Sequence, residues 1–503
     1  MKLRESICAV LIGAGMLCFS SAEVIGESDN ISEPKKYEAN WNSLNSRPTP
    51  TWFLDAKFGI FIHWGVYAVP GWSPRGEYSE WYWNRMHDRN PRNPWWRYHV
   101  ENFGGDFDYF DFAPMFKAKH YDPAFWADLF VKSGAKYVVP TSKHHDGYAI
   151  WPSAEANKAW GRAWNSVDVG PERDLLGELA NECRKRDLKF GFYYSLYEWY
   201  NPIWLKDRKE YVQHHLFPQF KDVVTRYSPD LIFSDGEWDM HSRDWKSEEL
   251  LAWLYNESPC KEEVIVNDRW GNECRHKNGG YYTTEYAAGM QNGDHAWEES
   301  RGMGNSYGYS RRETAEEYKS SRYFIISLAD TVSRGGNLLL DIGPDEDGLI
   351  PPIMQQKLLD IGDWLKVNGE AIYETRCAAR TTEWTEGVRP EQKRGQYMIK
   401  DSILDQIGQK PVGENARKKC FFTRKGDTNF AITAGWPGDT LTIKLIKVSP
   451  ETEVTLLGRE EKLDYTVDGE TLMIKMPVLN VDQVPCQYAY SFKITHSEIL
   501  PEK

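Results

Sequence analysis

A short apolar run that ends at a carboxylate is the segment most suggestive of chemistry. Residues 231–233 read Leu-Ile-Phe after a proline, and Asp235 follows one serine later. Such a run is typical of a buried strand in a parallel sheet, and in α/β proteins functional groups gather where strands end. An isolated Asp-Gly pair would more often close a turn, so the neighbouring segments must decide whether this carboxylate is functional.

Six consecutive predicted strands deliver a polar or ionisable side chain at the same end. Loop composition alone would not place histidine, arginine and acid so consistently, which predicts a catalytic or binding site there. The residues at these ends are His63, His144, His145, Tyr193, Tyr194, Asp235, Arg269 and Glu285.

Two of these features allow a second interpretation. Arg269 could be a structural partner of the adjacent Asp268 or of another carboxylate. The pair His144-His145 could bind a metal, but adjacent residues of a strand point apart and no Cys, Asp or Glu at ligand spacing completes a site. The sequence therefore predicts no metal at this pair. It favours histidines that bind sugar hydroxyls.

Short apolar runs alternate with amphipathic helical patterns through the first two thirds of the chain. This order predicts a (β/α)8-like barrel or a doubly wound sheet. No Gly-x-Gly-x-x-Gly loop follows a strand, which disfavours a dinucleotide, and no cofactor is expected. The predicted strands are 58–63, 135–141, 190–194, 231–234, 264–267, 281–284 and 337–342, and the predicted helices are 123–133, 174–187, 314–333 and 353–367.

From about residue 376 the pattern changes to short strands without helices between them, which indicates an antiparallel β-sandwich. We predict a catalytic barrel domain over 23–376, which includes a polar N-terminal arm, and a β-sandwich domain over 377–503. The predicted sandwich strands are 420–423, 428–433, 440–447, 453–457, 471–475 and 489–494.

The N-terminus has the pattern of an export signal. Basic residues precede an apolar stretch over 7–19, and small residues end at Ala22. This stretch is too short to span a bilayer, so we predict a signal peptide over 1–22, an exported periplasmic or secreted protein, and no integral membrane segment after cleavage. Cys18 faintly resembles a lipoprotein acylation site, which leaves lipid anchoring as a minor alternative.

Composition limits the classes of partner and ligand that the protein is expected to bind. The net charge of −13 argues against nucleic acid and anionic membranes, and favours a neutral ligand. The six cysteines beyond residue 22 are widely spaced, which indicates scattered thiols with one or two bridges at most. Eleven of the 22 tryptophans lie between Trp52 and Trp164. Flat rings stack on the apolar faces of sugars, so this density favours carbohydrate.

Several ordered blocks between Trp52 and Tyr373 resemble the α-L-fucosidases of glycoside hydrolase family 29, and the C-terminal sandwich is like that of the family. The blocks are Trp52-Phe53-x-Asp55-Ala56-Lys57-Phe58-Gly59-Ile60-Phe61-Ile62-His63-Trp64-Gly65, Glu80-Trp81-Tyr82, Lys143-His144-His145-Asp146-Gly147, Tyr193-Tyr194-Ser195, Asn267-Asp268-Arg269-Trp270-Gly271, Ser306-Tyr307-Gly308-Tyr309 and the run 335–344.

The resemblance implies a retaining exo-glycosidase that removes terminal α-L-fucose from oligosaccharides or glycoconjugates, on a barrel that departs from regular eightfold form. It implies that Asp235 is the nucleophile and Glu285 the acid/base. The substrate-binding residues that it implies are His63, Glu80, Trp81, His144, His145, Tyr194, Arg269 and Tyr307, with Tyr193 equally close in sequence to the Tyr194 position.

Some alternatives stay open. Phe233 stands where relatives often carry a tryptophan, and Glu298 is a second candidate for the acid/base. Fucose lacks a 6-hydroxyl, so its methyl group should lie on aromatic surface, for which Tyr307, Phe233 and Trp81 are candidates. An apolar pocket discriminates weakly against one added hydroxyl, so an exo-α-L-galactosidase is an alternative activity. A non-catalytic fucose-binding lectin on the same scaffold is another.

Overall fold

A computed structural model describes residues 36–287, 289–290, 294–390 and 402–502. The predicted signal peptide and Cys18 lie outside this range. Within it, no helix is both long enough and apolar enough to cross a membrane.

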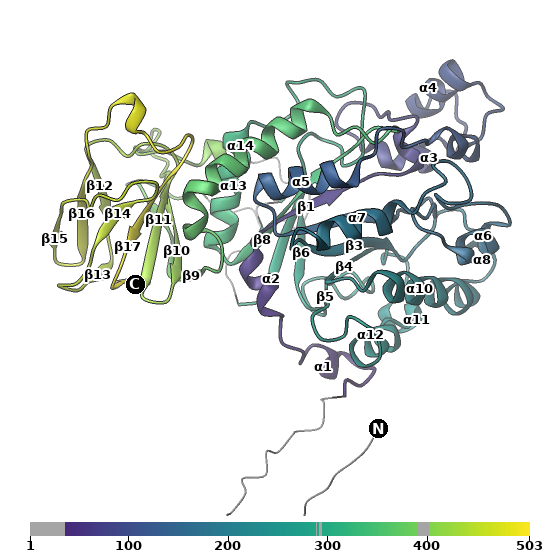
Figure 1. Ribbon diagram of the computed structural model, residues 1–503, viewed down its shortest axis with the longest axis horizontal. Helices are drawn as coiled ribbons and strands as arrows, with labels where there is room; N and C mark the ends of the chain where they lie inside the picture. The colour runs from purple at the N-terminus through teal and green to yellow at the C-terminus, as the bar shows by residue number, and fades with distance from the viewer. Residues whose placement is uncertain (1–35, 288, 291–293, 391–401, 503) are drawn as a thin grey trace, which may run out of the picture. The chain divides into compact units, whose positions relative to one another are not determined.

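Eight parallel strands form one curled sheet, which confirms the predicted barrel-like fold (Figure 1). The order is β5-β4-β3-β2-β1-β8-β7-β6, so β5 and β6 are the edge strands. Backbone amides of Gly280 and Tyr281, just before β6, donate to the carbonyl of Val266 in β5 at 3.0 and 3.2 Å. The sheet therefore curls far enough for its two edges to meet at one point. The strands are β1 (Phe58–Ile62), β2 (Tyr137–Lys143), β3 (Lys189–Ser195), β4 (Leu231–Asp235), β5 (Ile265–Val266), β6 (Tyr282–Glu285), β7 (Trp297–Gly302) and β8 (Gly336–Ile342).

Seven of these strands overlap the predicted ones, and β7 was not predicted. Its sequence Trp-Glu-Glu-Ser-Arg-Gly carries three charged side chains, which do not resemble an apolar buried strand. Five of its six residues are nevertheless buried, because buried partners accommodate the charges. Arg301, for example, pairs with Glu299 at 2.5 Å.

Helices cover the outside of the sheet (Figure 1). The prediction for 123–133 matches α5, which begins after Asp122 accepts hydrogen bonds from two backbone amides and ends at Gly134 in a left-handed conformation. The long helices are α4 (Pro94–Phe103), α5 (Pro123–Ser133), α7 (Leu175–Arg184), α10 (Phe217–Tyr227), α12 (Ser247–Asn256), α13 (Ser321–Ser333) and α14 (Pro352–Asn368). The short ones are α1 (Trp41–Leu44), α2 (Thr51–Ala56), α3 (Tyr82–Met86), α6 (Ala154–Trp160), α8 (Pro202–Lys206), α9 (Arg208–Tyr211) and α11 (Ser242–Trp245).

Side chains that point into the sheet's concave face fill the inside of the barrel. Phe61, Tyr137, Tyr193, Phe233 and Leu339 belong to this inner core and are almost fully buried. Their side chains form the floor on which the functional pocket rests.

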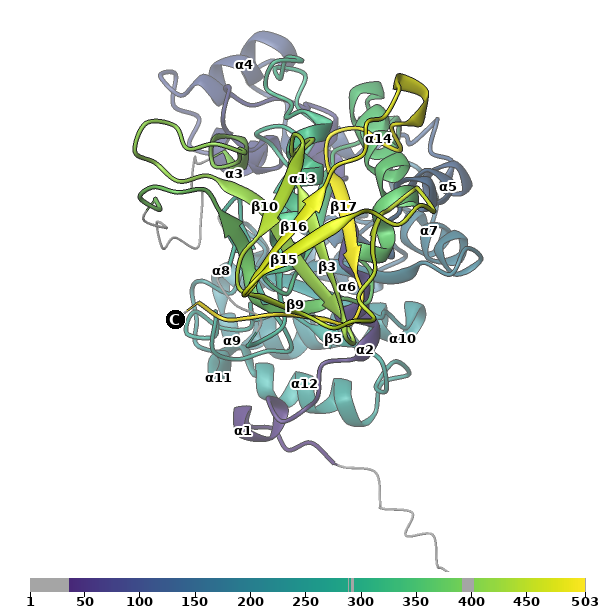
Figure 2. The same ribbon diagram turned by 90° about the vertical axis from the view of Figure 1, so that its left-hand side faces the viewer.

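The C-terminal strands form antiparallel sheets, as predicted (Figure 2). One sheet has the order β14-β17-β11-β10-β9, a second has β12-β16-β15, and β13 pairs with β18. The predicted strand over 440–447 is two strands, because Leu445 adopts a positive φ of 51° between them. The strands are β9 (Arg376–Trp384), β10 (Lys418–Lys425), β11 (Thr428–Thr433), β12 (Thr440–Ile443), β13 (Ile446–Val448), β14 (Val454–Leu456), β15 (Tyr465–Asp468), β16 (Thr471–Lys475), β17 (Tyr490–Ile494) and β18 (Ser497–Ile499).

This C-terminal part packs on the last two barrel helices. The Trp364 indole of α14 donates to the Ala489 carbonyl at 2.9 Å, and Lys418 of β10 pairs with Asp330 of α13 at 2.6 Å. Strand β9 runs across the predicted boundary at residue 377, which stays a prediction.

None of the six cysteines of the described residues forms a disulfide bond. The one or two bridges allowed by the sequence are therefore not present in this part of the chain.

Candidate active site

A pocket of about 310 Å³ opens at the carboxyl ends of the barrel strands. It gathers side chains from the strands β1, β3, β4, β6 and β7 and from the loops that follow β1, β2, β4, β5 and β7. Nine of the predicted site residues line it: His63, Glu80, Trp81, His144, His145, Asp235, Arg269, Glu285 and Tyr307.

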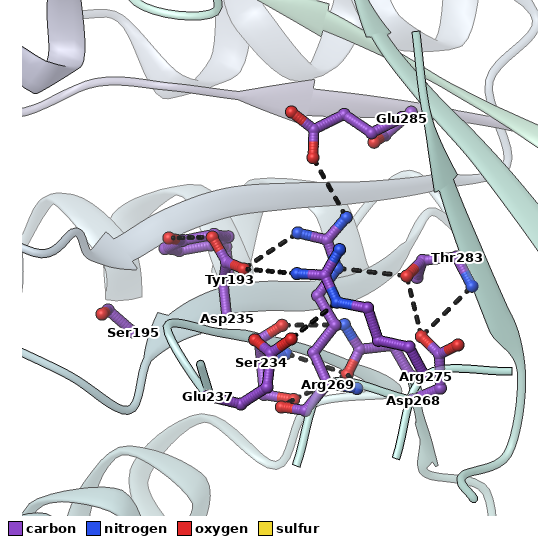
Figure 3. Close-up of polar contacts among 12 residues, drawn as sticks. Tyr193, Ser195, Ser234, Asp235, Glu237, Asp268, Arg269, Arg275, Thr283 and Glu285 are labelled. Carbon is purple, nitrogen blue, oxygen red and sulfur yellow. Dashed lines mark hydrogen bonds and ion pairs between the residues drawn. The ribbon is translucent and has the colours of Figure 1, made fainter. Parts of the chain in front are cut away.

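One guanidinium joins the two candidate catalytic carboxylates. Arg269 donates from Nη1 to Asp235 Oδ1 at 2.9 Å and from Nη2 to Glu285 Oε2 at 3.2 Å. Its Nε donates to the Thr283 hydroxyl at 3.1 Å, which fixes the plane of the fork. Figure 3 shows the guanidinium between Asp235 and Glu285. All three residues are buried, so these charge-assisted bonds act in a poorly solvated site.

The surroundings of Asp235 keep it ionised. Burial alone would raise its pKa, but the charge of Arg269, helped by that of Arg275, outweighs this and holds the pKa of Asp235 below its ordinary value. The Tyr193 hydroxyl also donates to Oδ2 at 2.9 Å. An ionised carboxylate fixed in this way has the properties of a nucleophile.

The surroundings of Glu285 have the opposite effect. Burial and the negative charge of Asp235 raise the pKa of Glu285, against the lowering effect of Arg269. The Tyr78 hydroxyl donates to Oε1 at 3.1 Å and orients the carboxyl group. Two carboxyl groups with pKa values driven apart are the arrangement required for one base or nucleophile and one acid.

Three histidines line the pocket in neutral form. Burial lowers the pKa of His63 to about 3 and that of His145 to about 4, and it holds the pKa of His144 well below its usual value. His63 Nδ1 lies 2.7 Å from Asp341 Oδ1, which fixes the orientation of the ring. Neutral imidazoles offer one donor and one acceptor each, which suits them to sugar hydroxyls.

Glu80 adds a further carboxyl group to the wall. Its Oε2 accepts from the Gly308 amide at 2.9 Å and from the Ser306 hydroxyl at 3.3 Å. Burial raises the pKa of Glu80 to about 7. This group can therefore donate or accept a hydrogen bond near neutral pH.

Aromatic rings close the remaining sides of the pocket. Tyr307 stacks on His63 with ring centroids 4.8 Å apart, and Phe233 lies beneath Arg269. Trp81 stacks on Trp238, which is 37% exposed at the mouth. The three predicted candidates for an apolar wall, Tyr307, Phe233 and Trp81, thus all line the pocket.

Tyr194, a predicted substrate contact, does not face the pocket. Its hydroxyl donates to Gln219 on α10 at 2.9 Å, outside the sheet. Tyr193 occupies the pocket instead, because successive side chains of a strand point to opposite faces. Of these two tyrosines, Tyr193 and not Tyr194 therefore lines the pocket.

Glu298, the second candidate for the acid/base, is also absent from the pocket lining. It is fully buried within the barrel, where the Tyr137 hydroxyl donates to it. Burial raises its pKa to about 8. The pKa of Glu298 thus suits a general acid, but its side chain does not line the pocket.

Five pocket residues were not predicted as site residues: Phe61, Tyr78, Trp238, Arg275 and Ser300. Tyr78 and Trp238 directly flank predicted motifs, at two residues before Glu80 and three after Asp235, so an extended motif search would have found them. Arg275 lies in a loop without any recognisable pattern. Its Nη2 is 3.7 Å from Asp235 and its Nε donates to the buried Glu237 at 2.6 Å.

Among the described residues, no cluster of three or more His, Cys, Asp and Glu side chains is arranged to hold a metal ion. A barrel with a buried carboxylate pair in a pocket at the carboxyl ends of its strands is an architecture of glycoside hydrolases.

Comparisons with known proteins identify the family. Residues 24–370 match the family model described as "Alpha-L-fucosidase", and residues 413–495 match the "Alpha-L-fucosidase C-terminal domain". The tissue α-L-fucosidase of Rattus norvegicus is 40% identical over 503 residues, covering 98% of this chain and 99% of its own. The α-L-fucosidase of Dictyostelium discoideum is 46% identical over 445 residues, covering 83% and 93%.

Solved structures agree with this result. The crystal structure of Thermotoga maritima α-fucosidase in complex with fucose is 33% identical, with a TM-score of 0.73 over 92% of this chain and 100% of that one. The chain therefore belongs to the α-L-fucosidase family of glycoside hydrolases.

Proposed function

We propose that this enzyme hydrolyses terminal α-L-fucosidic linkages of oligosaccharides or glycoconjugates with retention of configuration, with Asp235 as nucleophile and Glu285 as acid/base. The observation that carries the proposal is the Arg269 guanidinium, which contacts both carboxylates at 2.9 and 3.2 Å. A single fork that holds both groups keeps them close together, as a direct displacement by one of them requires.

In the first step, Asp235 Oδ attacks the anomeric carbon while the bond to the leaving oxygen breaks. Glu285 gives its proton to that oxygen, so the aglycone leaves as a neutral alcohol and a glycosyl ester forms on Asp235. In the second step, Glu285 removes a proton from water, and the hydroxide attacks the anomeric carbon and releases Asp235. The pKa of Asp235, held low by Arg269, and the raised pKa of Glu285 suit these roles.

The pocket is suited to fucose in both its polar and its apolar parts. The histidines, Glu80 and Tyr193 offer hydrogen bonds to ring hydroxyls, whereas Phe233 and the neighbouring rings offer a surface for the C5 methyl group. The fucose complex of the Thermotoga maritima relative supports the same ligand here. An α-L-galactosidase remains the second candidate, since L-galactose differs only by the 6-hydroxyl.

The test is nitrophenol release from 4-nitrophenyl α-L-fucoside and from the matching α-L-galactoside, with Asp235→Asn measured beside the wild type. We expect the fucoside to be the better substrate, and we expect the substitution to reduce turnover by about a thousandfold or more while fucose binding persists. Turnover of the variant within about tenfold of wild type would exclude Asp235 as the nucleophile. Fucose binding by wild type without any turnover would favour the lectin.

We also propose that residues 1–22 direct export and are removed. Sequencing the N-terminus of the mature protein tests this. A terminus at Glu23 supports the proposal, and an acylated Cys18 would show lipid anchoring instead.

A further inference from the structure

A second, larger cavity lies at the opposite end of the barrel from the catalytic pocket. Its volume is about 810 Å³, and its walls come from the amino ends of β1 and β8 and from strand β9. Catalytic and binding groups of the first pocket do not line it. The cations among its lining residues are Lys57, Arg334, Arg376, Arg380, Arg389 and Lys418, and the carboxylates are Asp294 and Glu502.

Most of these cations already have a carboxylate partner. Arg334 and Lys418 pair with Asp330 at 2.5 and 2.6 Å. Arg376 pairs with Asp55 at 2.7 Å. Arg380 and Arg389 pair with Glu383 and Glu502 in the same way, at 2.8 and 2.5 Å. Among the described residues, the positive charge of the cavity is therefore largely balanced, with one exception.

Lys57 is the exception. Its side chain is 2% exposed and lines the cavity, and none of the ion pairs found among the described residues involves it. Burial and the nearby charge of Arg376 lower the pKa of Lys57 to about 8, so the group still carries its charge at neutral pH. The Asp55 carboxylate, which pairs with Arg376 at 2.7 Å, opposes this lowering without cancelling it. A buried charge without a partner is costly, and a second cation beside it increases the cost.

We propose that this cavity binds a small oxyanion of the sulfate or phosphate class, held between Lys57 and Arg376. An oxyanion has acceptors for an ammonium and a guanidinium at once, and it would neutralise the unpaired charge of Lys57. The cavity exceeds the size of a free inorganic ion, so a sulfated or phosphorylated sugar is a ligand of the same chemistry. The site is separate from the catalytic pocket and does not depend on the proposed reaction.

The experiment is a thermal unfolding titration of the full chain with sodium sulfate, sodium phosphate and glucose 6-sulfate, each against sodium chloride at equal ionic strength. We expect a saturable rise of the unfolding midpoint at millimolar anion, because a ligand that binds only the folded state stabilises it. Lys57→Met should weaken the apparent affinity by at least about tenfold, since a hydrogen bond to a charged group is lost. A response to the sugar sulfate alone would identify a saccharide as the ligand, and an equal response to all three would identify the free ion.

Two further variants make the test selective. Lys366→Met removes an exposed lysine from α14 and should respond like wild type. Arg376→Gln removes the cation on the other side of the site, so it should also weaken the rise of the unfolding midpoint. In chloride alone, Lys57→Met should be no less stable than wild type, because it removes an unpaired buried charge. Its hydrolysis of the aryl fucoside should equal that of wild type. A wild type without a saturable shift, or a Lys57→Met shift equal to that of wild type, would overturn the proposal.

Discussion

Replacing Arg269 by methionine should move the whole pH profile of hydrolysis to higher pH. Arg269 lowers the pKa of both Asp235 and Glu285, so its removal raises both values. Asp235 must be ionised to attack, and the acid limb of the profile follows its pKa upward. Glu285 must be protonated to donate, and the basic limb follows in the same direction.

The contacts set the size of the shift. A hydrogen bond to a charged group contributes about 1.5 to 3 kcal/mol, and one pKa unit corresponds to about 1.4 kcal/mol. Loss of the 2.9 Å bond from Arg269 to Asp235 should therefore move the acid limb by roughly one to two units. Arg275, at 3.7 Å from Asp235, remains and keeps the shift from being larger. At the original optimum, kcat/KM should fall by about a hundredfold or more, because the oriented carboxylates lose their common support.

The assay is kcat/KM for 4-nitrophenyl α-L-fucoside across the pH range in which the protein stays folded, with Arg269→Lys as the matched control. Lysine keeps the charge but not the fork, so it can reach one carboxylate at a time. Its acid limb should lie between those of wild type and Arg269→Met. An acid limb that stays in place while activity falls would refute the role of Arg269 in the ionisation of Asp235.

Three further outcomes are expected. Glu285→Ala should abolish cleavage of natural linkages and affect aryl fucosides with acidic leaving groups much less, whereas Glu298→Gln should retain activity on both. Kinetic measurements on the two kinds of substrate test this, and the reverse result would exchange the roles of the two glutamates. Tyr193→Phe should lower kcat/KM about tenfold through its lost bond to Asp235, whereas Tyr194→Phe should keep activity and lose about 1 kcal/mol of stability; equal kinetic effects would contradict the placement of the two rings. Lys143→Met should lower the free energy of unfolding in urea by about 3 to 5 kcal/mol, because its fully buried carboxylate partner, 2.5 Å away, is left without the lysine charge. A decrease below about 1 kcal/mol would argue against this.

The sequence predicts strands well where apolar side chains define them and poorly where buried charges do. Strands β1, β2, β3, β4 and β8 consist largely of apolar residues and were found within a few positions. Strand β7 was missed because its glutamates and arginine are paired only in three dimensions.

The site shows the same limit at the level of single residues. Position along the chain places Asp235 and Glu285 at strand ends, but it does not say which of Tyr193 and Tyr194 faces inward. That choice depends on strand register, which is fixed by pairing such as that of Tyr193 with Phe233 in β4. Arg275 reaches the pocket from a loop whose path no local pattern encodes.

The charges around Asp235 explain how the site can hold the proton that Glu285 donates in the first step of the proposed reaction. Two guanidinium groups, Arg269 and Arg275, face three buried carboxyl groups, Asp235, Glu237 and Glu285. The pocket histidines carry no charge, so the two guanidinium and three carboxyl groups have no net charge only if one carboxyl group keeps its proton. The pKa of Asp235 is lowered while those of Glu237 and Glu285 are raised, so the proton is held by one of the latter. Arg275 donates to Glu237 at 2.6 Å, closer than the 3.2 Å contact of Arg269 with Glu285, which favours the ionised form of Glu237 and the protonated form of Glu285. Arg275, the pocket residue without a sequence signal, thereby helps to keep the proton on the carboxyl group that lies beside the leaving oxygen in the proposed mechanism.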